Sequence, residues 1–324
     1  MQAIVQHRYG SPDVLVLEDI DAPIPGADDV LVEVGAAGVD PSVWHLMTGL
    51  PLVMRLGLGL RAPRSKIRGR DVAGRVAAAG SNVTQFAPGD LVFGTCDGSF
   101  AEFACAREKT LAHAPANLSV EESAAVPTSA CTALRGLRDA GKLQAGERAL
   151  IIGAGGGIGT FAVQLAKVLG AEVTGVCGTS KVDLVRNLGA DEVIDYTRAD
   201  FANGASRYDV IFDTAGNRPL SHLRRALSKK GTLVIIGGEG KGRWLGVGRQ
   251  ARALMLSPLV AQTFRAPIVI AGSADLLTLK ELIEAGKVKP IVSKTYRLTE
   301  APTAIREWER GHTAGKLVIS LSAR

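Results

Sequence analysis

One glycine-rich segment, Gly153-Ala154-Gly155-Gly156-Gly157-Ile158-Gly159, has the residue types and spacing of a phosphate-binding turn. Glycine has no Cβ atom, so the backbone of such a turn can approach a phosphate closely. The unpaired N–H groups at the start of a following helix favour its negative charge. The strict dinucleotide fingerprint begins with glycine, where this chain has Ala154. An ordinary tight turn is therefore the alternative interpretation.

The elements on either side of this segment favour the dinucleotide interpretation. An apolar strand, Arg148–Ile152, runs directly into it, and a helix over Ile158–Leu169 follows. A second strand is predicted at Glu172–Val176. The fingerprint requires this order of strand, turn, helix and strand. The pattern predicts that a dinucleotide pyrophosphate is bound at this turn, with Ala154, Gly156 and Gly159 at the fingerprint positions and Gly157 and Ile158 between the last two.

The residues after the second strand indicate which dinucleotide is bound. A site for NAD has Asp or Glu at the end of this strand, where it binds the ribose hydroxyls. Here the strand is followed by Thr179, Ser180 and Lys181, and the next carboxylate is Asp183. An ammonium group attracts a 2′-phosphate, so the sequence predicts NADPH rather than NADH. Alternatively, Thr179 caps the next helix and Lys181 is solvated.

The hydrophobic pattern of the sequence changes along the chain, and this change predicts an α/β protein of two domains. Residues 1–123 contain short alternating runs between Gly and Pro turns, which are typical of a β-rich unit. Residues 124–272 alternate strands with helices, which predicts a parallel, doubly wound sheet. The alternating run Lys316–Leu321 is expected to return to the first unit, so that 273–324 complete it. The strands predicted in the second domain are Arg148–Ile152, Glu172–Val176, Glu192–Ile194, Asp209–Phe212, Thr232–Ile236 and Ile268–Ala271.

The composition of the sequence limits which partners the protein is expected to bind and in which cell compartment it is expected to lie. The 324 residues carry a formal charge of +6 but only 5% aromatics, which disfavours nucleic-acid binding. No uncharged apolar run approaches the ~20 residues of a membrane span. Met1–His7 alternates like a strand rather than a secretory signal, and four scattered cysteines without a CxxC motif suit a reducing compartment. We therefore expect a cytoplasmic protein. The basic cluster between Arg55 and Arg70 is interpreted as a loop over a pocket or, alternatively, as a weak contact with an acidic membrane surface.

A set of motifs, in their order and spacing, identifies a family. From Met1 to about Leu321 the chain resembles the zinc-free medium-chain dehydrogenases/reductases, the group of quinone oxidoreductases and zeta-crystallin. The resemblance implies a GroES-like catalytic domain, a Rossmann domain, an active-site cleft between them and hydride transfer from a nicotinamide. The motifs are Tyr9-Gly10-Ser11-Pro12-Asp13-Val14-Leu15, Gly69-Arg70-Asp71-Val72-Ala73-Gly74, Pro88-Gly89-Asp90-Leu91-Val92-Phe93-Gly94, Gly98-Ser99-Phe100-Ala101-Glu102, Ser129-Ala130-Cys131-Thr132-Ala133-Leu134, the glycine turn, Leu188-Gly189-Ala190-Asp191 and Gly311-His312-Thr313-Ala314-Gly315-Lys316.

The resemblance also implies contacts with NADP(H) outside the glycine turn. By position, Thr132 would lie near the nicotinamide ribose and ring, and Tyr196 would join Thr179, Ser180 and Lys181 around the 2′-phosphate. Ala215 and Gly216 would border the adenosine. The residues expected around the nicotinamide are Ile236, Gly237, Gly238, Ala271 and Gly272. For each of these glycines and alanines, the alternative is that the residue only shapes a turn.

Zinc is not expected in this chain. Zinc-bearing relatives place a His in the segment that matches Gly69-Arg70-Asp71, but here that position is Arg70, and a guanidinium does not ligate zinc. No cysteine occurs before Cys96. A site without a Lewis acid suits an electrophilic acceptor, such as a quinone or an α,β-unsaturated carbonyl. The alternatives are carbonyl reduction of the alcohol dehydrogenase type and a non-catalytic dinucleotide-binding protein.

Asp40 and His45 are the predicted catalytic residues, because reduction leaves an oxyanion that needs a proton. Relatives often have Asn at the position of Asp40, and Tyr or Lys at that of His45. Burial disfavours the ionised carboxylate, so Asp40 could act as an acid. His45 is a candidate proton donor near neutral pH, or alternatively a partly exposed loop residue.

Two further segments bear on the substrate and on assembly. Residues 241–264 are apolar and basic, and they are expected either to line the mouth of the cleft or to pack against a partner. The strand Thr232–Ile236 is expected to lie at an exposed sheet edge. Because an unpaired apolar edge is a liability in a monomer, this predicts a homodimer.

Overall fold

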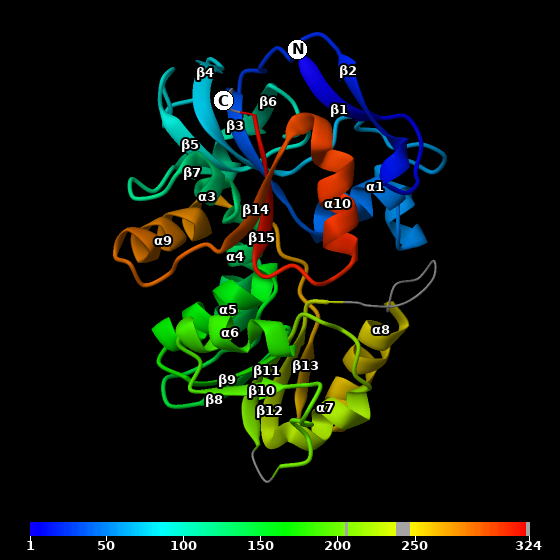
Figure 1. The fold of residues 1–324 in the computed structure, drawn as a ribbon, viewed down its shortest axis with the longest axis vertical. Coiled ribbons are helices and arrows are strands. Elements are labelled where there is room, and N and C mark those ends of the chain that lie inside the picture. Colours follow the sequence, from blue (N-terminus) through cyan, green and yellow to red (C-terminus); the bar gives the residue numbers. More distant parts are fainter. Residues whose placement is uncertain (205–206, 238–246, 322–324) are drawn as a thin grey trace. The chain divides into compact units, whose positions relative to one another are not determined.

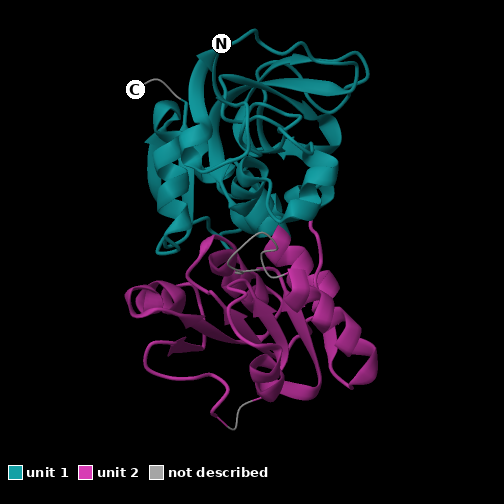
Figure 2. Ribbon diagram, turned by 90° about the vertical axis from the view of Figure 1, so that its right-hand side faces the viewer, with its two compact units in different colours: residues 1–131, 270–324 teal, residues 132–269 magenta. Residues whose placement is uncertain are grey.

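The computed structural model describes residues 1–204, 207–237 and 247–321 (Figure 1). The chain forms two compact units (Figure 2). Unit 1 consists of Met1–Cys131 and Ile270–Arg324, and unit 2 of Thr132–Val269. The sequence patterns place the corresponding boundaries after residues 123 and 272. In the structure, the boundary between Cys131 and Thr132 falls inside helix α4 (Pro127–Arg135), which begins in unit 1 and ends in unit 2.

Unit 2 contains a six-stranded parallel sheet in the order β10-β9-β8-β11-β12-β13. Numbered along the chain within this unit, the order is 3-2-1-4-5-6, which is that of a doubly wound dinucleotide-binding fold. This confirms the predicted fold class. The strands are β8 (Arg148–Ile152), β9 (Glu172–Cys177), β10 (Glu192–Asp195), β11 (Tyr208–Asp213), β12 (Leu227–Ile235) and β13 (Thr263–Arg265). The α-helices after α4 are α5 (Gly157–Val168), α6 (Val182–Asn187), α7 (Leu220–Ala226) and α8 (Val247–Leu256).

Two expectations about the far side of this sheet are wrong. The sixth strand is β13, at Thr263–Arg265, rather than Ile268–Ala271. Pro267 has no N–H to donate to a ladder, and the exposed fractions of Ile268 and Ile270 are 94% and 63%. Strand β12 is also not an edge, because it pairs with β11 on one side and with β13 on the other.

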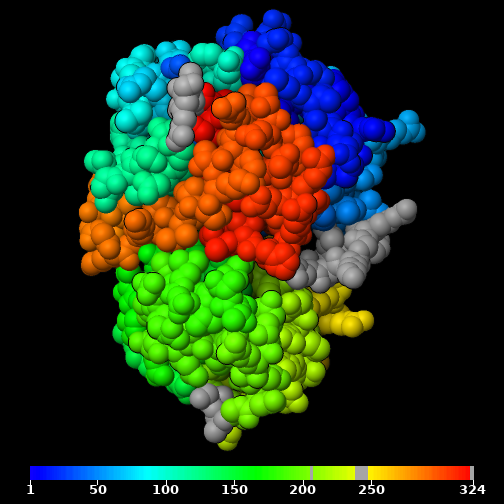
Figure 3. Space-filling view, in the orientation of Figure 1, coloured from blue at the N-terminus to red at the C-terminus, as the bar shows by residue number. Residues whose placement is uncertain are grey.

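Unit 1 is built on a largely antiparallel sheet in the order β14-β15-β3-β4-β5-β7, with β6 paired to β3. Strand β15 pairs with β3, which confirms that the end of the chain returns to the first unit. The C-terminal helices cover the face of this unit that Figure 3 shows in orange and red. The strands are β3 (Asp29–Val39), β4 (Asp71–Ala79), β5 (Leu91–Thr95), β6 (Phe103–Arg107), β7 (Leu111–His113), β14 (Val292–Arg297) and β15 (Lys316–Ser320), with a separate pair β1 (Gln2–Gln6) and β2 (Leu15–Asp19). The helices are α1 (Pro41–Thr48), α2 (Arg55–Leu58), α3 (Val120–Ala124), α9 (Ser273–Glu284) and α10 (Ala301–Glu309).

Local sequence signals explain where the functional elements begin. Asp40 caps α1, Pro41 occupies its first turn, and Gly49 ends it with a left-handed φ of 63°. Ser119 and Glu122 form a capping box at the start of α3. Strand β8 is buried almost throughout, as expected for a parallel sheet covered on both faces. Among the described residues, no helix combines the length and apolarity that crossing a bilayer requires.

Candidate cofactor site and active-site residues

The glycine-rich turn joins β8 to α5, and its geometry leaves no room for a side chain at Gly159. A Cβ atom on Gly159 would lie 2.0 Å from the carbonyl oxygen of Gly153. Gly153 has a left-handed φ of 82°. Within the described part of the chain, the N–H groups of Gly157 and Ile158 donate no hydrogen bond, as is usual in the first turn of a helix. Two donors are therefore available where an anion would bind.

Lys181 brings a cation to this turn. A Cβ atom on Gly155 would lie 2.7 Å from Cδ of Lys181, so the lysine side chain lies directly against the glycines. Lys181 is half-buried, and this burial lowers the pKa of its ammonium group. The aliphatic stem of a lysine thus lies against the turn that leads into α5, and a cation near such a turn suits phosphate groups.

Thr179 does not cap a helix, so that alternative is wrong. Its hydroxyl donates to Oδ2 of Asp195 at 2.6 Å, and the residue begins a short 3-10 helix capped by Gly178. The side chain of Tyr196 lies beside the same loop, because a Cβ atom on Gly178 would be 3.4 Å from its Oη. Ser180 is exposed. The structure therefore brings the four residues predicted around the 2′-phosphate into one neighbourhood.

Asp195, at the end of β10, is an acid that sequence analysis missed in this neighbourhood. The hydrogen bond from Thr179 lowers the pKa of its carboxyl group. Thr197 also donates to it, from its N–H at 3.0 Å and from its hydroxyl at 2.8 Å. Arg198 lies 3.6 Å away and neutralises part of its charge. The only local signal is an acid closing a short apolar strand.

Asp213 organises the loop after β11, where Ala215 and Gly216 were predicted to border adenosine. Its side chain is buried, and Oδ1 accepts the N–H groups of Ala215 at 3.2 Å and of Gly216 at 3.0 Å. Its other oxygen pairs with Arg249 of α8. Sequence analysis missed this pair.

The other predicted cofactor residues lie in both units, and Ile236 and Gly237 pack beside the loop after β11. Gly237 packs so closely on β11 that a Cβ atom there would lie 2.0 Å from the carbonyl oxygen of Thr214. Ile236 donates its N–H to the carbonyl of Asp213 at 2.9 Å. Thr132 lies on α4, and Ala271 and Gly272 belong to unit 1. Gly238 lies outside the described residues, as do Trp244 and Leu245 of the apolar 241–264 segment.

Asp40 is buried in unit 1, with only 1% of its surface exposed. Its Oδ1 accepts the N–H of Ser42 at 2.6 Å, which caps α1, and the Ser42 hydroxyl donates to the same atom. Its Oδ2 is buried and has no hydrogen-bond partner among the described residues. Burial of a polar oxygen without a hydrogen-bond partner is costly, so Oδ2 is the reactive end of this side chain only if another group reaches it.

His45 lies half-buried in α1, not in a loop. Its Nδ1 is 2.7 Å from the carbonyl oxygen of Leu50, which can only accept, so Nδ1 carries the hydrogen. In the neutral ring Nε2 is then an acceptor, and His45 can donate from Nε2 only as imidazolium. Burial lowers the pKa of His45. Trp44 packs edge-on against His45, with ring centres 5.3 Å apart.

Asp71 and Lys316 form a buried ion pair that sequence analysis did not anticipate. Both residues occur in quoted motifs, but no pattern within either motif links the two. Oδ2 of Asp71 lies 3.5 Å from Nζ of Lys316, and their side chains are 0% and 2% exposed. The only signal in the sequence is a charged residue at the start of an otherwise apolar strand.

The basic cluster between Arg55 and Arg70 is divided in the structure. Arg55 lies over the ring of Tyr9, 4.3 Å from its centre. Arg68 is 2% exposed, whereas Arg61, Arg64 and Lys66 are exposed. Arg70, at the position where zinc-bearing relatives have His, lies 3.9 Å from Asp97. No group of three or more His, Cys, Asp or Glu side chains suited to a metal ion occurs in the described ranges. The expectation of a metal-free site stays a prediction.

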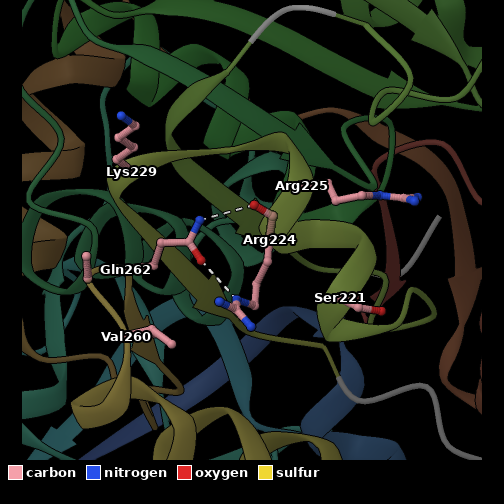
Figure 4. A pocket seen from close by; sticks show the side chains of 7 residues that line it. Ser221, Arg224, Arg225, Lys229, Val260 and Gln262 are labelled. Carbon is pink, nitrogen blue, oxygen red and sulfur yellow. Dashed lines mark hydrogen bonds between the residues drawn. The ribbon is translucent and has the colours of Figure 1, made fainter.

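A pocket of about 500 Å³ opens in unit 2 beside α7 and the residues before β13. None of the predicted site residues lines it. In Figure 4 the amide of Gln262 faces Arg224, with which it forms two hydrogen bonds, while Arg225 and Lys229 point elsewhere. Its cations therefore do not converge on one point.

Comparisons with known proteins agree with this fold and these motifs. Residues 26–116 match the family model described as alcohol dehydrogenase GroES-like domain, and residues 188–319 match the model described as zinc-binding dehydrogenase. The mitochondrial NAD(P)H oxidoreductase RTN4IP1 of Mus musculus is 32% identical over 99% of this chain and 89% of its own. The 2-methylene-furan-3-one reductase of Solanum lycopersicum is also 32% identical, over 98% and 79%.

Solved structures show the same relationship. The Escherichia coli quinone oxidoreductase complexed with NADPH superposes with a TM-score of 0.85 at 25% identity, covering 99% of this chain and 100% of that one. The fold, the glycine turn and Arg70 at the zinc-ligand position together place the chain in one class. It belongs to the zinc-free medium-chain dehydrogenase/reductase superfamily.

Proposed function

We propose that this protein is an NADPH-dependent, zinc-independent oxidoreductase that reduces a quinone or an α,β-unsaturated carbonyl. The observation that carries the proposal is Lys181 lying against Gly155, near the start of α5, where two N–H groups have no partner among the described residues. The named activities of the relatives support both acceptor classes, since one is a quinone oxidoreductase and another reduces a methylene-furanone. Oxidation of NADPH by such acceptors is the direct test.

The residues of unit 2 fit the cofactor. A Cβ atom at Gly159 would collide with the turn and one at Gly155 with Lys181, and the amides at the start of α5 would bind the pyrophosphate. Lys181, Thr179 and Tyr196 would hold the 2′-phosphate. NADPH, when bound, supplies a hydride. Thr132 would contact the nicotinamide end, and Asp213 would hold the loop of Ala215 and Gly216 beside the adenosine.

Unit 1 supplies the proton in this proposal. His45 is the donor, because it is half-buried and its Nε2 is available in the imidazolium form. Asp40 is too deeply buried to meet a substrate, and it acts on His45 through its charge, which raises the pKa that burial lowers. This assigns Asp40 a supporting role rather than that of the acid.

The pH dependence of turnover tests the role of His45. Because the pKa of His45 lies below its ordinary value of 6.5, its imidazolium fraction falls about tenfold per pH unit between about pH 6.5 and 8.5. We expect kcat of the wild type to fall in parallel. His45→Gln should lower kcat at pH 6.5 by about tenfold or more and remove this slope. An unchanged slope in His45→Gln would assign the proton to another group.

Charge reversal at Lys181 tests the choice of cofactor. Lys181→Glu places an anion against the glycine turn, so we expect KM for NADPH to rise at least about tenfold more than KM for NADH. Lys230→Glu, at an exposed position in the same unit, makes the same change of net charge and should alter neither KM. Equal effects of Lys181→Glu on the two cofactors would contradict a 2′-phosphate site.

We also propose a homodimer, formed at β13 rather than at β12. Strand β13 pairs only with β12 among the described strands, and Ile268 and Ile270 are exposed just beyond it. A second copy would cover this open edge. Light scattering should give twice the 33.8 kDa mass, and Ile268→Lys with Ile270→Lys should yield monomer. A monomeric wild type at micromolar concentration would contradict the proposal.

A further inference from the structure

Three neighbouring strands of unit 1 bring two carboxyl groups and one ammonium group to one end of the sheet. Strand β3 is followed directly by Asp40, while β4 begins with Asp71 and β15 begins with Lys316. Because β4 and β15 flank β3 and run antiparallel to it, their first residues lie beside its last ones. Each of the three charged residues is at most 2% exposed.

Asp71 and Lys316 of this cluster form hydrogen bonds with the first turn of α4. Oδ1 of Asp71 accepts the N–H of Thr128 at 3.0 Å and also accepts its hydroxyl hydrogen. Lys316 is paired with the other oxygen of Asp71 and donates to the hydroxyl of Ser129 at 3.1 Å. Thr132 follows about one turn later on the same helix. The position of Thr132 therefore depends on these contacts.

The charges of the cluster do not cancel. With both carboxyl groups ionised it would hold two negative charges and one positive charge in a nearly water-free interior, which is costly. Burial raises the pKa of Asp71 to about 6, and the charge of Asp40 adds to this effect. Of the other groups near the cluster, the Cys96 thiol is neutral because burial raises its pKa, and Glu121 of α3 bonds to Ser320, at the opposite end of β15. The other titratable group that senses Asp40 is His45, whose pKa is lowered by burial and raised by the charge of Asp40. The cluster can therefore take up one proton as the pH falls.

We propose that Asp71 is a positioning residue, whose ionised carboxylate holds the first turn of α4 so that Thr132 meets the nicotinamide, and that proton uptake by Asp71 weakens this hold. The inference rests on the proposed function, because Thr132 is a proposed nicotinamide contact. Asp71 acts through the helix and does not itself touch the substrate. The phosphate contacts belong to the glycine turn, so NADPH affinity should change little.

The test follows the fluorescence of bound NADPH between about pH 4.5 and 8, with the dissociation constant and kcat measured alongside. In the wild type we expect the nicotinamide emission change to titrate with a midpoint near 6, while the dissociation constant stays within about threefold. Asp40→Asn removes the like charge but keeps the helix cap, so the midpoint should move lower. The double variant Asp71→Asn with Lys316→Met keeps the pair neutral. It should bind NADPH with a smaller, pH-independent emission change and a reduced kcat.

Each outcome separates this inference from the proposed function. If the wild type fails to bind NADPH, the proposed function is wrong and the inference falls with it. If NADPH binds but Asp40→Asn and the double variant both keep the wild-type midpoint and emission, the proposed function stands and the cluster has only a structural role.

Discussion

Replacing Gly159 with valine is expected to lower the affinity for NADPH by about 100-fold or more, which corresponds to about 2.7 kcal/mol. A Cβ atom at this position would lie 2.0 Å from the Gly153 carbonyl oxygen and 2.8 Å from Cα of Ala154. The turn must therefore move away from the start of α5, and the N–H groups of Gly157 and Ile158 lose their alignment with the pyrophosphate. Fluorescence titration with NADPH measures the loss.

A matched control is available on another helix of the same unit. Gly248 lies in α8, and a Cβ atom there meets nothing within 4 Å. Gly248→Val should bind NADPH as the wild type does. Near-normal affinity in Gly159→Val, in a protein whose circular dichroism is unchanged, would show that the pyrophosphate is bound elsewhere.

The second large effect is expected from Lys316→Met, which should lower the free energy of unfolding by about 3–5 kcal/mol at pH 7. The substitution leaves the buried carboxylate of Asp71 without a counter-charge and next to Asp40. The double variant Asp71→Asn with Lys316→Met removes the orphaned charge and should recover most of the loss. Urea denaturation gives the free energies of unfolding of the wild type, the single variant and the double variant, provided that all three have the same m-value.

The same variant has a defined pH dependence. The pKa of Asp71 is raised to about 6 from 3.8, so its contribution to stability is fully present below 3.8 and is lost as the pH rises through 6. Without Lys316 the ionised form is still less favourable. The difference between wild type and Lys316→Met should therefore shrink as the pH is lowered through 6. A difference below about 1 kcal/mol at pH 7 would mean that the pair contributes little to stability.

The doubly wound unit could be predicted well because its signals are local. Strand β8 is apolar after Arg148 and β9 is buried after Glu172, and the glycine turn between them indicates the fold and predicts the cofactor site. The predicted strand at Ile268–Ala271 failed because an apolar run does not show whether it is covered, and here Ile268 is exposed. The choice of β12 as an edge failed for a related reason, since strand order is a property of the whole sheet.

The candidate site shows the same limit. Lys181 and Thr179 were predicted from residues close to the glycine turn in sequence. The acid that binds Thr179 is Asp195, 16 residues away, and the partner of Asp71 is 245 residues away in Lys316. Such pairings arise from sheet topology, which no local pattern contains. The catalytic role of His45 stays a prediction, and its tautomer depends on the carbonyl of Leu50, which the sequence does not place.

The most direct test of the central claim is the loss of reduced-cofactor absorbance with purified protein. A panel of quinones and 2-alkenals is run in parallel with NADPH and NADH. The same protein treated with a zinc chelator serves as a control. The proposal predicts turnover with NADPH, a weaker reaction with NADH, and no effect of the chelator. Preference for NADH would contradict the assignment of Thr179, Ser180 and Lys181. No turnover of any acceptor by a protein that binds NADPH would contradict the proposed reduction and favour a non-catalytic dinucleotide-binding protein.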